Sequence, residues 1–307
     1  MGKMIQTWVG ECSAWECDDL GHMNMRHYMT KVHQARQMFI IRLGLDDAFR
    51  RDSVSSVRAR DIHIKYLGEA RPGAPLRIET GLLSISGSEA QLCHIMYHAD
   101  DRLAATIVET VEHISLVSMK AFDWAQRVGH AAGRFIIDQP GPSQPRHVNY
   151  AEKAKRPKEK RLKKLGAPLI GMGVFQPHEM GVDKRATVQS LLGRVTETIA
   201  HYLEAWPELH DEDYRAAGHS AALLEARIVI HNRPEVGDAY HFYSGVSGCN
   251  EYTRSLVHNV VDAVTGKSFF SMVGHGCQFN LNTRKLIKTS AEQQAQLRKV
   301  IIPDLTI

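Results

Sequence analysis

The chain has 307 residues, 43% of them hydrophobic, which is enough for two ordinary domains with cores of their own. It contains no run near the ~18 consecutive apolar residues of a membrane span, and its beginning, MGKMIQTWVGECSAWECDD, lacks the apolar region of a signal peptide. Both observations lead us to expect a cytoplasmic protein. The net charge of +4 comes from one segment, residues 153–164, which carries a net +7, so we expect no nucleic-acid-binding surface.

The first long helix is predicted to follow the segment DDLGHMN. Asn24 is a suitable N-cap for it, and Gly44 is a suitable residue to end it. Apolar residues recur between them at helical spacing, namely Met25, Tyr28, Met29, Val32, Ala35, Phe39 and Leu43. Four strand-like runs separated by turn residues come next, over residues 60–67, 75–85, 89–99 and 103–116.

A connector is predicted after these strands. Residues 121–135 have the composition of a helix, and the stretch behind them is rich in Pro, Gly and Ser. The basic residues 153–164 follow, and a solvated linker is the simplest interpretation of them.

The second half repeats the pattern of the first at an offset near 160 residues. Asp183 is the expected N-cap of a helix that ends near Pro207. Its apolar stripe consists of Val188, Leu191, Leu192, Val195, Ile199 and Tyr202, and the strand-like runs behind it cover residues 223–232, 239–247, 252–263 and 267–281. Each half therefore has a strand, a long helix and four strands. A helix with one apolar stripe needs an antiparallel sheet to cover it, so the predicted class is α+β.

The segment WECDDLGHMNMRHY resembles the active-site motif of the hotdog-fold acyl-CoA thioesterase superfamily, in particular its 4-hydroxybenzoyl-CoA thioesterase-like branch. The matching residues are Asp18, Gly21, His22, Asn24 and Tyr28. The two halves together resemble the tandem (double) hotdog arrangement of plant acyl-ACP thioesterases. This resemblance implies two tandem hotdog domains, each a long central helix wrapped by a curved antiparallel sheet, packed as a pseudo-dimer.

Hydrolysis of a thioester requires a group that activates water or attacks the carbonyl, and donors that hold the developing oxyanion. A turn at Gly21 can bring Asp18 over the start of the helix, where its carboxylate can act as general base or as nucleophile. The free N–H groups of the first helical turn carry partial positive charge and can form the oxyanion hole. The alternative role of Asp18 is that of a turn residue.

The other motif residues keep more than one interpretation. Asn24 either orients water or the thioester carbonyl or serves only as the cap, and His22 either binds substrate or supports the turn. The resemblance implies that the backbone N–H near Met25 points at the thioester carbonyl and that Tyr28 lines the pocket. Cys17 is disfavoured as a nucleophile because the sequence places no base beside it. Neither the five scattered cysteines nor the histidines have the spacing of a zinc site, so no metal and no cofactor are expected.

The second half departs from the motif, so a degenerate site is expected there. An alignment on Gly181 pairs Asp18 with His178, His22 with Val182, and Asn24 with Lys184. Two alternatives remain for this half: Glu179 supplies a carboxylate for the same work, or Lys184 and Arg185 contact the phosphates of coenzyme A.

These features predict an N-terminal hotdog domain with the active-site motif (1–119), a connector with a helix and basic linker (120–165), a C-terminal hotdog domain with a degenerate motif (166–290) and a tail (291–307). The predicted function is hydrolysis of an acyl-CoA to free acid and CoA. A CoA substrate is favoured over a carrier protein because the plant acyl-ACP thioesterases carry their working motif in the second repeat, whereas the motif of this chain lies in the first. A non-catalytic acyl-CoA-binding module and a hotdog hydratase or dehydratase are the alternatives. With an acyl-CoA substrate, the basic residues 153–164 have a second interpretation, as a strip that attracts CoA phosphates. Association of two chains as a homodimer is left open.

Overall fold

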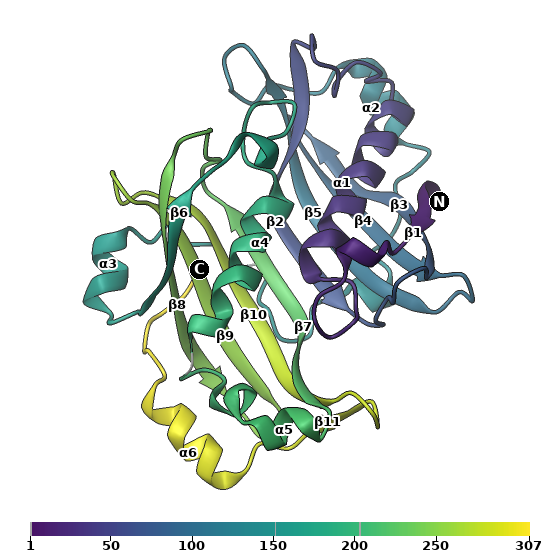
Figure 1. Ribbon diagram of the computed structural model, residues 1–307. Coiled ribbons are helices and arrows are strands. Elements are labelled where there is room, and N and C mark those ends of the chain that lie inside the picture. The colour runs from purple at the N-terminus through teal and green to yellow at the C-terminus, as the bar shows by residue number, and fades with distance from the viewer. Residues whose placement is uncertain (1, 151, 203) are drawn as a thin grey trace. The chain divides into compact units, whose positions relative to one another are not determined.

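The computed structural model describes residues 2–150, 152–202 and 204–307, and the chain divides into two compact units (Figure 1). The first unit comprises Met1–Pro145 and Met180–Leu192, and the second comprises Arg146–Glu179 and Gly193–Ile307. Among the residues that the structure describes, no helix combines the length and the apolar character needed to cross a membrane.

The first unit contains one antiparallel sheet and one long helix. The strand order in this sheet is β1–β3–β4–β5–β2. The elements in chain order are β1 (Ile5–Glu11), η1 (Ala14–Glu16), α1 (Met25–Arg42), β2 (Ser55–Tyr66), β3 (Pro75–Ser86), β4 (Glu89–His98), β5 (Leu103–Ser115), α2 (Gln126–Ala132) and η2 (Gly141–Ser143). The four strands predicted after the first helix are confirmed, and β2 begins earlier than expected. The helix expected over residues 121–135 is confirmed only for its central part, α2.

The apolar face of α1 forms part of the core of the first unit. Residues three and four positions apart lie on one face of a helix, and the apolar residues buried on α1 are Tyr28, Met29, Val32, Ala35, Phe39 and Ile40. The Asn24 side chain caps the helix by accepting a hydrogen bond from the Arg26 N–H. Gly44 follows the helix with φ +90°, a conformation that ends helices and suits glycine. The predicted cap and the predicted stop are confirmed.

The strands of the second half of the chain also pair antiparallel, in the order β7–β10–β9–β8–β6, and β11 pairs with β10. The elements in chain order are α3 (Glu159–Lys164), β6 (Leu169–Val174), η3 (Pro177–Glu179), α4 (Val188–Thr198), η4 (Ile199–His201), η5 (Pro207–His210), α5 (Glu212–Ala216), β7 (His219–Ile230), β8 (Ala239–Cys249), β9 (Thr253–Asp262), β10 (Ser268–Asn280), β11 (Lys285–Ile287) and α6 (Ala291–Lys299). The four predicted strands are confirmed. The second long helix is shorter than its apolar stripe suggested, because the chain tightens into η4 after Thr198.

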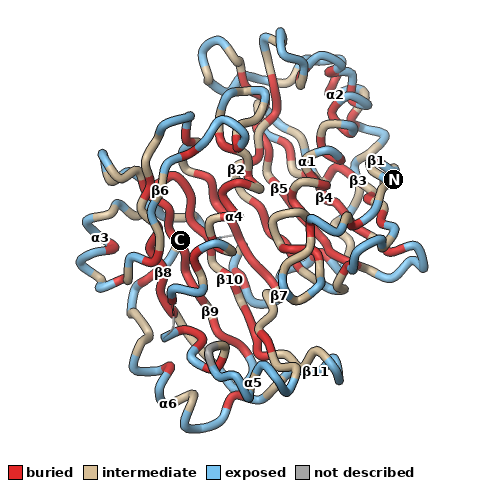
Figure 2. The backbone as a smooth tube through the Cα atoms, viewed as in Figure 1, coloured by how far each residue is buried: buried red, intermediate tan, exposed pale blue. Residues whose placement is uncertain are grey.

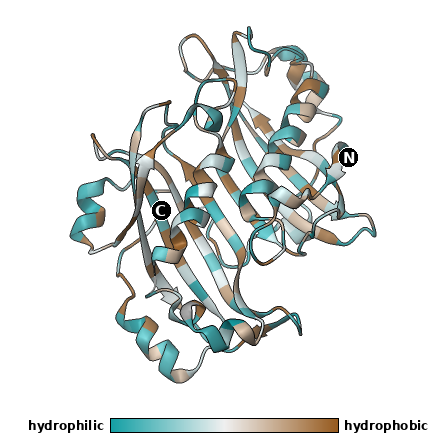
Figure 3. Cartoon of the chain, in the orientation of Figure 1, coloured by the Kyte–Doolittle hydropathy of each residue, from teal (hydrophilic) through white to brown (hydrophobic). Residues whose placement is uncertain are grey.

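Burial follows the strands of both halves of the chain, whereas α3 and α6 are largely exposed (Figure 2). Along many strands, hydrophobic and hydrophilic residues form alternating bands, as expected for sheets with two different faces (Figure 3). The basic segment includes α3, whose Leu162 is fully buried in a cluster with Tyr243, Val257 and Leu305. The eight Lys and Arg side chains of residues 153–164 are all exposed. Part of this segment is therefore a helical turn docked on the second unit rather than a loose linker.

Candidate active site

The DDLGH segment forms a tight turn at the entrance of α1. Cys17 and Met23 pair as an antiparallel bridge and close the turn. Inside it, the Asp18 N–H donates to the His22 carbonyl at 3.0 Å, and the Gly21 N–H donates to the Asp18 carbonyl at 3.0 Å. Gly21 has φ +72°, a left-handed conformation that glycine adopts without steric cost. The predicted need for glycine at this position is confirmed.

Two backbone hydrogen bonds and one to a side chain fix the end of the turn to its surroundings. The Met23 N–H donates to the Ala70 carbonyl at 2.8 Å, and the Asn24 N–H donates to the Glu16 carbonyl at 2.8 Å. The Asn24 Oδ1 atom accepts the Arg26 N–H at 3.1 Å, and α1 begins at Met25. Asn24 therefore acts as the helix cap, one of the two roles that its position suggested.

Asp18 is half-buried in this turn, and its Oδ1 atom accepts the Leu20 N–H at 3.1 Å. Burial is the largest influence on the pKa of the Asp18 carboxyl and raises it above the ordinary value. Backbone hydrogen bonds from Leu20 and His22 oppose this effect, while neighbouring Asp19 adds to it. A carboxylate that is only partly stabilised as an anion is a stronger base than a solvated one.

His22 is paired with a carboxylate that the sequence reasoning missed. The His22 Nε2 atom lies 3.1 Å from Glu69 Oε2, and the two side chains are 13% and 28% exposed. Glu69 follows β2 and immediately precedes Ala70, whose carbonyl holds Met23. Its only signal in the sequence is an acidic residue in the turn after a strand, which is too common to indicate a site.

Tyr28 lies one turn into α1 with its side chain 4% exposed. Its hydroxyl donates a long hydrogen bond of 3.4 Å to the Gly68 carbonyl, and its ring meets that of Tyr66 edge-on at 5.1 Å. Burial raises the pKa of Tyr28, and the nearby Asp18 and Cys12 raise it further, so the phenol stays neutral. The structure thus brings Tyr28 near Asp18, within the core of the first unit.

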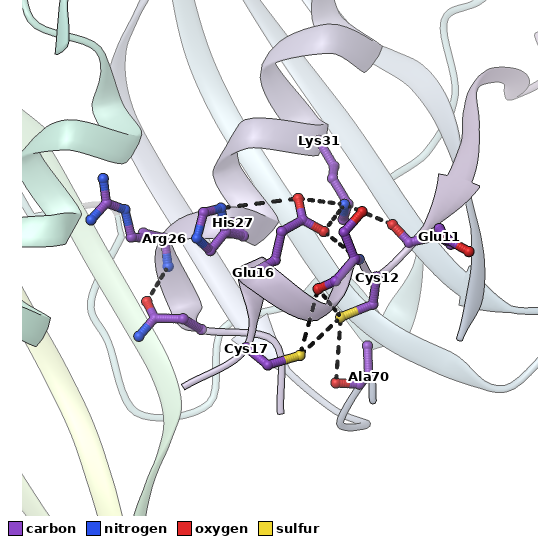
Figure 4. A network of polar contacts seen from close by, with 10 residues as sticks. Glu11, Cys12, Glu16, Cys17, Arg26, His27, Lys31 and Ala70 are labelled. Carbon is purple, nitrogen blue, oxygen red and sulfur yellow. Dashed lines mark hydrogen bonds and ion pairs between the residues drawn. The ribbon is translucent and has the colours of Figure 1, made fainter. Parts of the chain in front are cut away.

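A buried ion pair ties the chain before the turn to α1 (Figure 4). The Lys31 Nζ atom donates to both carboxylate oxygens of Glu16, at 2.7 and 2.9 Å, and to the Glu11 carbonyl at 2.9 Å. Glu16 also accepts the Ser13 N–H at 2.8 Å. His27, on the first turn of α1, lies 4.0 Å from Glu16, and burial lowers the pKa of its ring. This pair holds η1 and the helix start in one arrangement.

The second repeat forms the same turn, but in a register three residues away from the expected one. Met180 bridges to Ala186, the Gly181 N–H donates to the Arg185 carbonyl, and the Lys184 N–H donates to the Gly181 carbonyl. These contacts match those made by Cys17, Asp18 and Gly21 in the first repeat. Gly181 therefore stands in the place of Asp18, and the alignment of Asp18 with His178 is wrong.

The same register corrects the other pairings in the second repeat. Lys184, with φ +57°, occupies the place of Gly21 rather than that of Asn24, and Arg185 rather than Val182 occupies the place of His22. The helix cap is Thr187, whose Oγ1 atom accepts the Ser190 N–H at 3.3 Å, and not Asp183. The expected cap was wrong because Asp183 lies inside the turn, where it accepts the Arg185 N–H.

Glu179 is the counterpart of Glu16. Its carboxylate accepts the Gln176 N–H, as that of Glu16 accepts the Ser13 N–H, and it pairs with Arg194 on α4. The side chain of Glu179 is 6% exposed and that of Arg194 is 12% exposed. A carboxylate held in this way has the structural role of Glu16, and no carboxylate stands at the Asp18 position in this repeat.

Two further features of the described residues bear on the site. Across residues 2–150, 152–202 and 204–307, no group of three or more His, Cys, Asp or Glu side chains is arranged to hold a metal ion. A shallow cavity of about 320 Å³ in the first unit is lined by Ser86, Gly87, Trp124 and His130 among others, and its lining residues come from outside the motif.

Residues 12–131 match the Thioesterase-like superfamily. Two curated relatives are both named L-carnitine dehydrogenase/betainyl-CoA thioesterase. The one from Ruegeria pomeroyi is 31% identical over 125 residues, which are 41% of this chain and 25% of that protein. The one from Agrobacterium fabrum is 27% identical over 139 residues, which are 45% of this chain and 28% of that protein. The match thus spans about a quarter of the length of these relatives.

Solved structures resemble nearly the whole chain. An acyl-ACP thioesterase from Bacteroides thetaiotaomicron aligns with TM-score 0.66 and 9% identity, over 89% of this chain and 97% of that one. The 12:0-ACP thioesterase from Umbellularia californica aligns with TM-score 0.67 and 11% identity, over 90% of this chain and 94% of that one. At such identities the likeness concerns the fold, and it confirms the predicted α+β class with two tandem hotdog domains.

Proposed function

Because residues 12–131 match the Thioesterase-like superfamily, we propose that this chain hydrolyses acyl thioesters at a single site in its first repeat. The observation that carries the proposal is the Asp18 carboxyl, half-buried, with a raised pKa, in the turn that enters the capped helix α1. The second repeat supports a single site because Gly181 stands there in place of Asp18.

In the proposed reaction, Asp18 takes a proton from water as the water oxygen attacks the thioester carbonyl. Alternatively, its carboxylate attacks the carbonyl directly, and water then hydrolyses the acyl-enzyme anhydride. In both routes the oxyanion lies at the start of α1 near Met25, where helix N–H groups and the helix dipole favour negative charge. His22, whose Nε2 atom lies 3.1 Å from Glu69, forms a hydrogen bond with the substrate.

The proposed substrate is an acyl-CoA. The two curated relatives are named for a CoA thioester, betainyl-CoA, although they match this chain over only part of their length. The motif of this chain lies in the first repeat and not in the second, where plant acyl-ACP thioesterases carry theirs, and this favours CoA over a carrier protein. The proposal requires no metal or organic cofactor for the chemistry.

The test is release of free thiol from a panel of acyl-CoAs by the wild-type chain and by Asp18→Asn and Asp18→Ala. Loss of a general base typically costs ~10²- to 10⁴-fold in rate, and we expect kcat to fall in this range in both variants. Asp19→Asn, which alters the exposed neighbour of Asp18, is the matched control and should keep most of the activity.

The pH dependence supplies a second readout. The ionised carboxylate is the active form, so kcat/KM should rise through a pKa above the ~3.9 of an ordinary Asp and then level off. Tight acyl-CoA binding without turnover by the wild type would identify a binding module instead. Addition of water to an enoyl-CoA would identify a hydratase.

A single turnover in H₂¹⁸O can identify Asp18 as the nucleophile. If water attacks the anhydride at the Asp18 carbon, the label enters the protein, which general-base catalysis cannot produce. Label in the acid product alone is expected for a general base and also for attack of water at the acyl carbon of the anhydride.

A further inference from the structure

Two free cysteines lie side by side at the base of the turn that carries Asp18 (Figure 4). The Cys12 and Cys17 Sγ atoms are 3.5 Å apart, Cys12 is fully buried, and Cys17 is partly exposed. We infer that Cys12 and Cys17 form a reversible disulfide that switches the proposed site off under oxidising conditions. The effect on activity rests on the proposed function, whereas formation of the disulfide does not.

The second repeat shows that this turn does not need the two thiols. The Cys12 N–H donates to the Ala74 carbonyl and the Phe175 N–H to that of Asp238, so Phe175 is the counterpart of Cys12. Met180 is the counterpart of Cys17, since it forms the matching bridge. The same backbone arrangement is thus built with two apolar side chains. The thiol pair is present only in the repeat that carries the carboxylate, which favours a role in that site.

Closing the disulfide has to move Cys12, Cys17 or both, and Cys17 belongs to the turn. An S–S bond is about 2.05 Å long, so the two sulfur atoms must approach by roughly 1.5 Å from their present 3.5 Å. Cys17 directly precedes Asp18 and is bridged to Met23, whose N–H is held by Ala70. Misplacing a reacting group by ~1 Å can cost ~10²-fold in rate. The oxidised protein is therefore expected to lose at least ~10-fold in kcat/KM by the same argument.

The reaction needs an oxidant, for which we name a low-molecular-weight disulfide, RSSR. The Cys17 thiolate attacks one sulfur of RSSR, which breaks the S–S bond and releases one thiolate. The Cys12 thiolate then attacks the Cys17 sulfur and releases the second. The protons of the two cysteines pass to the two leaving thiolates, so two RSH form for each protein disulfide. An external thiol reverses both steps.

The exposures assign the order of the two steps. Cys17 is the accessible thiol, and burial, followed by the hydrogen bond to Cys17, raises the pKa of Cys12 to about 12. Cys12 is thus protonated and protected at neutral pH. The second step is therefore the slower one.

The experiment treats the full chain with oxidised glutathione and follows mass and activity together. Trypsin yields one peptide, residues 4–26, that contains both cysteines, and a disulfide between them lowers its mass by two hydrogens. We expect this loss in the wild type, together with a fall of at least ~10-fold in kcat/KM that dithiothreitol reverses. Cys17→Ser and Cys17→Met should remain active and unaffected by the oxidant. Cys249→Ser, at a partly exposed thiol in the second unit, is the control and should remain sensitive.

The outcomes separate this inference from the proposed function. If the peptide gains the mass of one glutathionyl group on Cys17 and no disulfide between Cys12 and Cys17 forms, the switch is refuted. If the disulfide forms and hydrolysis is unchanged, its regulatory role is refuted. If the reduced wild type hydrolyses no thioester, the proposed function fails, and with it the switch of activity, although the mass measurement still decides whether the disulfide exists.

Discussion

Replacement of Lys31 by Met tests the anchor beneath the candidate site. The Lys31 and Glu16 side chains are only 4% and 9% exposed, and their charges are 2.7 Å apart. Lys31→Met fills a similar volume but leaves the Glu16 carboxylate buried without its cation. Breaking a buried pair by removing one partner costs about 3–5 kcal/mol, because the remaining charge is uncompensated. His27, at 4.0 Å from Glu16, can take up a proton and offset part of this cost, so we expect about 3 kcal/mol.

Differential scanning calorimetry of the full chain measures the effect. At about 2–4 °C of Tm for each kcal/mol, the transition of the first unit should fall by roughly 6–12 °C. The double variant Glu16→Gln with Lys31→Met removes both charges and should recover much of the loss. Arg50→Met breaks an exposed pair with Asp47, in which both side chains are about 70% exposed, and is the matched control. It should shift stability by no more than about 0.5 kcal/mol.

The reasoning is refuted if Lys31→Met costs less than ~1 kcal/mol, or if the double variant is no more stable than Lys31→Met. The first outcome would mean that the carboxylate is effectively solvated. The second would mean that the pair contributes through packing rather than charge. The rate of thioester hydrolysis, measured on the same samples, should fall in the single variant because η1 and the turn lose their fixed position.

Two further predictions concern the first unit. Burial raises the pKa of Glu109, but Arg36 and His94 more than offset this and lower it to about 2, below the ~4.3 of an unfolded chain. The stability that Glu109 contributes is therefore present above pH ~4.3 and lost as pH falls towards 2. Glu109→Gln should be less stable than the wild type at neutral pH, and its free energy of unfolding should fall less steeply with acid than that of the wild type. Gly21→Ala should cost ~1–2 kcal/mol in urea unfolding, because φ is +72° and a Cβ there meets open space, so only backbone strain opposes it. Gly21→Asn should be milder, and an equal cost for both variants would contradict this account.

Much of the fold could be predicted from short-range patterns. The Asn24 cap, the Gly44 stop and the strand runs of both halves depend on neighbouring residues, whose conformational preferences act locally. The position of Asp18 ahead of a helix could likewise be predicted from the single segment WECDDLGHMNMRHY. The second motif was misaligned because Gly181 was matched to Gly21 as the turn glycine. In the structure Lys184 adopts the left-handed conformation instead, and backbone hydrogen bonds rather than residue type set the register.

The sequence by itself thus determined the order of helices and strands, the repeat and the candidate carboxylate, Asp18, on which the proposed thioester cleavage rests. These follow from periodicity, capping and one compact motif. Only the tertiary structure decided that Glu69 pairs with His22, that Lys31 neutralises Glu16, and that Cys12 lies against Cys17. Each of these contacts depends on how a strand, a turn and a helix pack in three dimensions, and side-chain packing leaves no pattern in the order of residues along the chain.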